Sequence, residues 1–117
     1  MITHWHKAAP EAPFYAVIFI SQKSEDLENY TETDAEMMRE SHKVGGFLGY
    51  SSKGDEKTGI FISYWRDQDA IEKWRQHQGH LKAKNQGAKR WYNYYHSMIC
   101  KVEQSVEFGK WLEMQGG

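Results

Sequence analysis

The sequence predicts an α+β fold in which helices cover one face of an antiparallel sheet. Three observations lead to this prediction. The chain has 117 residues, which suits one domain with a single core. Apolar, β-branched and aromatic runs alternate with amphipathic helical segments in the order β-α-β-β-α-β. A short polar turn separates the two middle strands, as in the ferredoxin-like plan.

The first strand is predicted at residues 14–21, FYAVIFIS, where β-branched and aromatic residues dominate. Neither face of this strand is polar, so both faces need cover. The preceding residues, 1–13, contain Pro10 and Pro13 and show no periodicity. We expect them to form an irregular leader.

A helix is expected over residues 30–43, with one apolar stripe and one charged face. Thr33 and Glu36 have the spacing of a capping box, although a start one turn earlier is also compatible. Gly45 and Gly46 follow and supply the backbone freedom that a helix C-terminus favours.

The next two strands, at residues 47–52 and 58–66, are predicted to form a hairpin. The loop between them, KGDEK, is polar and contains glycine. Both strands carry apolar bulk on both faces. Asp67 or Asp69 is placed to cap the helix that follows.

The second helix presents Ile71 and Trp74 along one stripe. Gly79 lies inside it and predicts a kink or break, because glycine weakens a helix by about 1 kcal/mol relative to alanine. Helical spacing continues to about residue 94. Alternation over 97–108 predicts the last strand, so the domain spans 14–108 and residues 109–117 form a tail without assigned structure.

A second subunit follows from the strands. They are apolar on both faces, and the chain is too short to build another covering layer. Two copies that pair their sheets face to face would form a two-fold homodimer.

Composition restricts the partners and the compartment. The formal charge is -1 and the basic residues are dispersed, so no footprint for nucleic acid or an anionic membrane is present. No apolar run approaches the roughly 20 residues of a membrane span. Cys100 is the single cysteine, which excludes an internal disulfide and fits a reducing compartment. We expect a cytoplasmic protein.

The ordered segments FYAVIFISQ, GFLGY, ISYW, AIEKWRQHQGHLKA and RWYNYY resemble the antibiotic biosynthesis monooxygenase family. The resemblance covers about residues 14–108. It implies a dimeric α/β barrel of ferredoxin-like subunits. It also implies one of two activities: cofactor-independent oxidation of phenolic or quinol-like aromatics with molecular oxygen, or haem degradation.

Haem-degrading members of that family use an asparagine on the first strand, a tryptophan on the helix after the hairpin, and a histidine ten residues further on. Trp74 matches the tryptophan, but Lys84 stands where the histidine would be, and the first strand lacks the asparagine. Haem binding would therefore need His77 or His80 as an alternative iron ligand.

His77 and His80 are three residues apart, which places them on neighbouring parts of a helix. Three readings stay open for this pair. It lacks the third ligand of a metal site. One imidazole, titrating near neutral pH, is a candidate general base for a phenolic substrate. Both are otherwise surface or interface residues.

Trp74 is the strongest pocket candidate, because both its stripe position and the resemblance select it. Five further aromatic residues either line a pocket for a flat aromatic ligand or belong to the core or the dimer interface: Phe47, Trp65, Trp91, Tyr92 and Tyr95. The first hypothesis is thus a homodimeric monooxygenase with no metal and no tightly bound organic cofactor. Haem chemistry and a non-catalytic ligand-binding homodimer are the alternatives.

Overall fold

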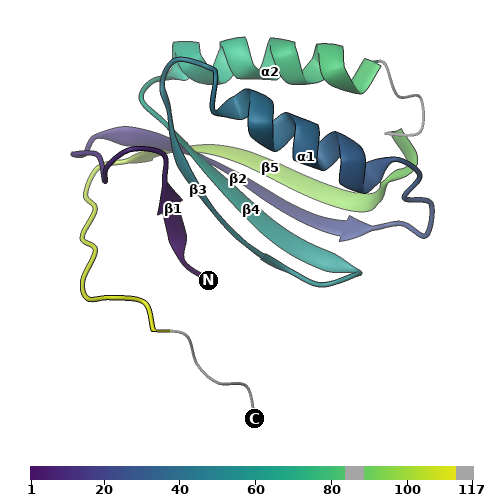
Figure 1. The fold of residues 1–117 in the computed structure, drawn as a ribbon, viewed down its shortest axis with the longest axis horizontal. Coiled ribbons are helices and arrows are strands. Elements are labelled where there is room, and N and C mark those ends of the chain that lie inside the picture. Colours follow the sequence, from purple (N-terminus) through teal and green to yellow (C-terminus); the bar gives the residue numbers. More distant parts are fainter. Residues whose placement is uncertain (84–88, 113–117) are drawn as a thin grey trace.

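The computed structural model describes residues 1–83 and 89–112. Its elements are β1 (Thr3–Trp5), β2 (Phe14–Lys23), α1 (Tyr30–Ser41), β3 (Phe47–Gly54), β4 (Thr58–Trp65), α2 (Gln68–Ala83) and β5 (Tyr92–Val102). Within this part of the chain the strands form one five-stranded sheet in the order β1-β3-β4-β2-β5. Neighbouring strands are antiparallel, and both helices lie on the same side of the sheet (Figure 1). The predicted ferredoxin-like α+β fold is confirmed.

Strand β2 lies inside the sheet, where it pairs with β4 on one side and β5 on the other. Val17, for example, lies between Ser63 and Ile99, and Ile18 lies between Ile62 and Met98. Because side chains alternate along a strand, these two rows point to opposite faces of the sheet. Val17 faces the helices, whereas Ile18 faces away from them.

The β3–β4 hairpin forms as predicted, with β3 two residues longer than expected. Asp55 organises the loop: its Oδ1 accepts hydrogen bonds from the backbone N–H groups of Lys57 and Thr58, both at 2.8 Å. An aspartate that satisfies the amides two and three residues on is a standard device of tight turns.

Helix α1 begins at Tyr30, one turn before the predicted capping box. Its N-cap, Asn29, has φ 61° and no side-chain capping hydrogen bond, and Thr33 is buried within the helix. The helix ends at Ser41, and Gly46 takes φ +93° in the turn to β3. This conformation favours glycine, and a Cβ at position 46 would lie 2.6 Å from the Cβ of Ala70.

Helix α2 is capped by Asp67, whose Oδ1 accepts the backbone N–H of Ala70 at 2.8 Å. Two predictions about this helix were wrong. It continues through Gly79 to Ala83 without a break. Helical spacing also does not extend to residue 94, because β5 starts at Tyr92 and ends at Val102 rather than spanning 97–108. The aromatic residues at the start of β5 pair with the end of β2, so tertiary pairing decided their conformation.

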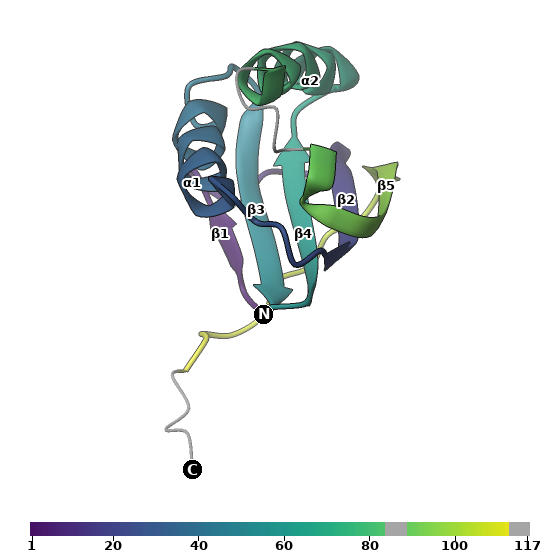
Figure 2. The ribbon, with the colours of Figure 1, turned by 90° about the vertical axis from the view of Figure 1, so that its right-hand side faces the viewer.

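The N-terminal residues are not wholly irregular, which corrects the predicted leader. Residues 3–5 form β1, which pairs with β3 and occupies one edge of the sheet, while β5 occupies the other (Figure 2). Trp5 packs on Phe14 and Tyr64, and its Nε1 donates to Glu107 Oε1 at 3.1 Å. Among the described residues, no helix is long and apolar enough to cross a membrane.

The hydrophobic core lies where β4 leads into α2. Phe47, Trp65, Ala70 and Ile71 form a buried cluster there, with Trp65 0% exposed. Beyond this cluster, a cavity lies between the two helices and the sheet. No helix of the described residues covers the opposite face of the sheet. We call it the open face, formed chiefly by Ile18, Ile20, Ile62, Met98 and Cys100.

Candidate functional site

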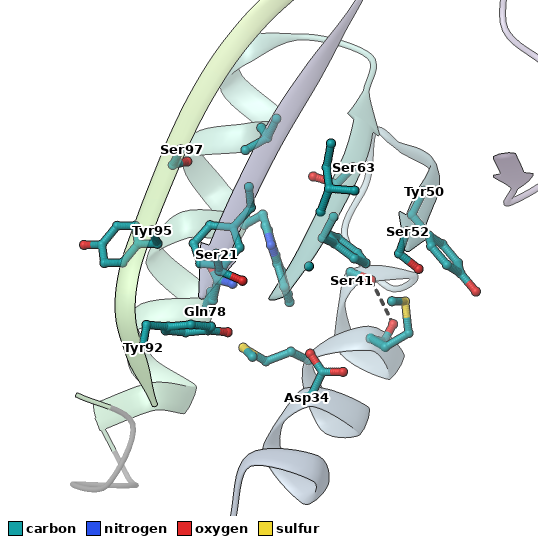
Figure 3. Close-up of a pocket in the computed structure, with 18 of the residues that line it drawn as sticks. Ser21, Asp34, Ser41, Tyr50, Ser52, Ser63, Gln78, Tyr92, Tyr95 and Ser97 are labelled. Atoms are coloured by element: carbon teal, nitrogen blue, oxygen red, sulfur yellow. Dashed lines mark hydrogen bonds between the residues drawn. The ribbon is translucent and has the colours of Figure 1, made fainter. Parts of the chain in front are cut away.

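The cavity has a volume of about 1810 Å³ and lies between the two helices and the sheet (Figure 3). Strands β2, β3, β4 and β5 form its floor, and α1 and α2 form its roof. It is larger than the roughly 300–1,000 Å³ of a typical small-molecule pocket, and one end opens to solvent.

The closed end of the cavity is aromatic. The rings of Trp65 and Trp74 stack with centroids 6.1 Å apart and an angle of 25° between their planes. Phe47 packs edge-on against Trp65 at 5.2 Å. On the sheet, Tyr50 and Phe61 stack at 5.8 Å. These flat walls suit a planar ring.

Small hydroxyl side chains alternate with the aromatic ones on the sheet floor. Ser21, Ser63 and Ser97 project from three strands toward the cavity (Figure 3). Trp65 Nε1 donates to Ser63 Oγ at 2.8 Å, which satisfies a buried indole donor. Serine in place of a bulky residue leaves the space between helix and sheet unfilled.

The open end carries a group of polar residues. Tyr92 from β5 and Asp34 from α1 lie across the opening from each other (Figure 3). The side chain of Tyr92 also forms a hydrogen bond with that of Tyr30. Burial is the main cause that raises the pKa of both phenols, and the hydrogen bond to Tyr30 raises that of Tyr92 further. Burial also raises the pKa of Asp34, opposed by the nearby charge of Lys23.

Five of the aromatic residues predicted from the sequence line the cavity: Phe47, Trp65, Trp74, Tyr92 and Tyr95. Trp91 does not. It is 1% exposed, packs edge-on against Tyr30 at 5.1 Å, and donates from Nε1 to the Glu28 carbonyl at 2.9 Å. It therefore holds Tyr30 and the loop before α1 in place from outside the cavity.

The family model for antibiotic biosynthesis monooxygenases matches residues 13–86 of this chain. The chain belongs to the antibiotic biosynthesis monooxygenase family. It is 43% identical over 100 residues to the uncharacterized protein YqjZ of Bacillus subtilis (strain 168), covering 85% of this chain and 88% of that protein.

Solved structures share the fold at low sequence identity. SnoaB from Streptomyces nogalater, described as a cofactor-independent oxygenase, superposes with a TM-score of 0.64 at 11% identity, covering 81% of this chain and 98% of SnoaB. Rv0793 from Mycobacterium tuberculosis superposes with a TM-score of 0.65 at 13% identity, covering 80% and 99% of the two chains.

The two histidines singled out in this monooxygenase-family chain lie away from the cavity lining. His77 is turned toward α1, where its Nε2 lies 3.4 Å from Glu40 Oε2, and its ring lies 5.9 Å from Trp74. His80 is exposed. The stripe of α2 that faces the cavity instead contains Trp74, Gln78 and Lys82. A catalytic role for either histidine stays a prediction.

The cavity does not suit haem in the manner of the haem-degrading members. Among the described residues that line it there is no histidine, and no group of three or more His, Cys, Asp or Glu side chains is arranged to hold a metal ion. Residue 84, which the family comparison placed at the iron-ligand position, lies outside the described residues. We derive no chemistry through haem.

Sequence reasoning missed Asp34 and Lys82 as cavity residues, and it selected Tyr92 as a pocket candidate but on the wrong kind of element. Tyr92 was assigned to a helix, which concealed its place at the start of an edge strand. Asp34 and Lys82 read as ordinary charged residues on helix surfaces. One signal was available: each belongs to the face of its helix that carries Met37 or Trp74, both of which line the cavity.

Proposed function

We propose that this protein is a monooxygenase that oxidises a small aromatic or quinone-like metabolite with molecular oxygen, without a tightly bound organic cofactor. The observation that carries the proposal is the aromatic-walled cavity between helices and sheet. The partly exposed Trp74 ring, stacked on the fully buried Trp65, provides a flat apolar surface for a planar substrate. Membership of the family and the shared fold with SnoaB support the type of chemistry.

The proposed reaction needs no external reductant. A phenolic substrate loses a proton and reacts as an electron-rich anion with oxygen. When an activated CH₂ group becomes a carbonyl, one oxygen atom enters the product and the other leaves as water. The substrate thus supplies all four electrons. His77 and His80 remain the candidates that the sequence offers as proton acceptor, and because neither lines the cavity, either would act through an intervening water.

Oxygen uptake with 1,8-dihydroxyanthrone, a planar phenolic probe with one activated CH₂, tests this function. In buffer with EDTA we expect one molecule of oxygen consumed per molecule of probe converted to anthraquinone. With ¹⁸O₂, one labelled atom should enter the new carbonyl. The spontaneous rate is subtracted by using heat-unfolded protein. Uptake no faster than this background, across phenolic and quinol probes, would reject the proposal.

We also propose that the protein acts as a homodimer joined through the open face. Ile18, Ile62 and Met98 form an apolar row across three strands, and each is only partly buried. Ile20, beside this row, is 36% exposed. A sheet face of this kind is stable in water when another layer covers it, and a second copy offers the same apolar surface.

A non-catalytic ligand-binding dimer is the second candidate function. It is favoured by one observation: among the described residues, neither histidine nor cysteine lines the cavity. In that case an aromatic probe would quench the fluorescence of Trp65 and Trp74 with saturable binding, while oxygen uptake stayed at background.

A further inference from the structure

The charged residues that line the cavity are unequally distributed by sign. Among the described residues, two carboxylates line it, Asp34 and Asp55. The cationic side chains that line it are more numerous: Lys23, Lys53, Arg75, Lys82, Lys89 and Arg90. The chain as a whole has a formal charge of only -1, so this excess of positive charge is local. A cavity lined by one sign of charge concentrates ligands of the other sign.

Several of these charges already have partners. Arg90 pairs with Asp26 at 3.5 Å. Lys23 donates to the Asp55 carbonyl at 3.1 Å and lies over the Tyr30 ring. Asp55 is held by the amides of its own turn. These groups belong to the local structure, and they are not available for a ligand.

Lys82 differs from them. It projects from the last turns of α2 and is partly buried in the cavity wall. It has no hydrogen-bond or ion-pair partner among the described residues. Burial lowers the pKa of its ammonium, because surrounding protein replaces water that would solvate the charge. An anion bound beside Lys82 would restore that lost stabilisation.

Two further unpaired cations lie near the same wall. Arg75 precedes Lys82 by seven residues, two turns along the same face of α2, and Lys89 lies just before β5. Neither has an ion-pair partner in the described part of the chain. The aromatic stack of Trp65 and Trp74 lies toward the closed end, and Lys82 lies toward the open end.

We propose that the natural ligand of the cavity is a flat aromatic acid whose ionised group, a carboxylate or a comparable anion, is bound by Lys82, with Arg75 and Lys89 adding positive potential. The inference rests on the proposed function, because it assumes that the cavity is the substrate site. It adds a substrate class that the apolar walls alone do not specify.

A matched pair of ligands tests the proposal without turnover. 3-Hydroxy-2-naphthoate and 2-naphthol share a hydroxylated planar skeleton and differ in one carboxylate. Binding of each is measured at pH 7.5 by tryptophan fluorescence quenching and by calorimetry. We expect the carboxylate to bind about ten-fold or more tightly than the neutral compound, as a charge-assisted hydrogen bond provides. The preference should shrink as sodium chloride is raised.

Variants of Lys82 test whether its charge causes the preference for the carboxylate ligand. Lys82→Met keeps the aliphatic length and should abolish the preference while leaving 2-naphthol affinity unchanged. Lys82→Arg should retain it. Lys73→Met is the matched control, because Lys73 lies on α2 but is exposed and outside the lining. Circular dichroism verifies that each variant is folded.

The outcomes separate this inference from the proposed function. Equal affinity of the two ligands for the wild type, or a preference that survives Lys82→Met, overturns the inference and leaves the monooxygenase proposal intact. A Lys82-dependent preference without oxygen uptake by any phenolic acid supports the inference and rejects the monooxygenase proposal. If neither ligand binds, the inference is rejected, and oxygen uptake alone decides the monooxygenase proposal.

Discussion

Trp74 from α2 stacks on Trp65 from β4, with ring centroids 6.1 Å apart. The pair joins a residue of the buried core to a residue of the cavity wall. The same ring contact therefore contributes to core packing and shapes the proposed binding site. Trp65 is fully buried, whereas Trp74 is only partly covered. The inner wall of the cavity therefore connects α2 directly to the buried core.

Replacement of Trp74 should affect both stability and binding. We expect Trp74→Ala to lower the free energy of unfolding by about 2 kcal/mol, near half of the cost for a fully buried tryptophan. The affinity for 3-hydroxy-2-naphthoate, measured by fluorescence quenching, should fall at least ten-fold. Trp74→Phe should restore most of the stability and most of the ligand affinity. Urea unfolding provides the first measurement, and Trp111→Ala, in the exposed tail, is the control. Wild-type binding by Trp74→Ala would place the ligand elsewhere.

The raised pKa of Asp34 predicts a pH-dependent effect on stability. Its pKa in the folded state exceeds the ordinary value of 3.8, so the folded protein holds this proton more tightly than the unfolded chain. The stabilising contribution is present below that value and is lost as pH rises through the folded-state pKa. Asp34→Asn should therefore raise the melting temperature at pH 7 and leave it nearly unchanged at pH 3. Glu56→Gln, in the exposed β3–β4 loop, controls for loss of a charge.

Adjacent glycines provide a sharp comparison. Gly46 has φ +93°, and a Cβ there would meet Ala70 at 2.6 Å. Gly45 has nothing within 4 Å of an added Cβ. Gly46→Ala should cost about 2 kcal/mol or more, from the left-handed backbone conformation and the clash together. Gly45→Ala should change stability by less than about 0.5 kcal/mol. Similar chemical-denaturation midpoints for the two variants would contradict the observed turn.

The open face predicts the oligomeric state. Light scattering after gel filtration should give about twice the chain mass of 13.8 kDa. Ile18→Glu should shift the protein to the monomer, because a carboxylate in an apolar interface loses its water without gaining a partner. Ala35→Glu, on the exposed surface of α1, should leave the dimer unchanged. A monomeric wild type at micromolar concentration would exclude the proposed interface.

Hemin provides a test of the haem alternative. Because no histidine lines the described part of the cavity, we expect no saturable, stoichiometric Soret shift on titration. If a shift does appear and bleaches with ascorbate in air, His77→Ala and His80→Ala will show which side chain ligates the iron. Such a result would replace the proposed reaction with haem degradation.

The sequence predicted the sheet, the hairpin and the order of elements because β2, β3 and β4 have strong local signals. It failed where long-range pairing overrode local spacing, as at Tyr92, which has helical periodicity but pairs with Lys23. β1 was missed because three residues cannot show alternation, and its partner, β3, supplies the order.

The same distinction between local signals and long-range contacts applies to the residues of the site. Trp65 and Trp74 follow from pattern and family resemblance. Lys82 and Asp34 can be assigned to the cavity only when the space between the two helices and the sheet is known. The periodicity of the sequence does not predict that space. The side chain of His77 points away from the cavity and contacts Glu40 of α1, a residue 37 positions away in the sequence.

The hydrogen bond between Trp5 and Glu107 joins two segments that both lie outside the family match at residues 13–86. The indole of Trp5 also packs edge-on against Phe14, the first residue of β2. The two ends of the chain therefore behave as one structural unit at the corner of the sheet. Trimming the gene to the family boundaries would remove both partners, and it would also remove β5, which pairs with β2 along its whole length. Shortened versions should therefore keep β1, β5 and Glu107 together.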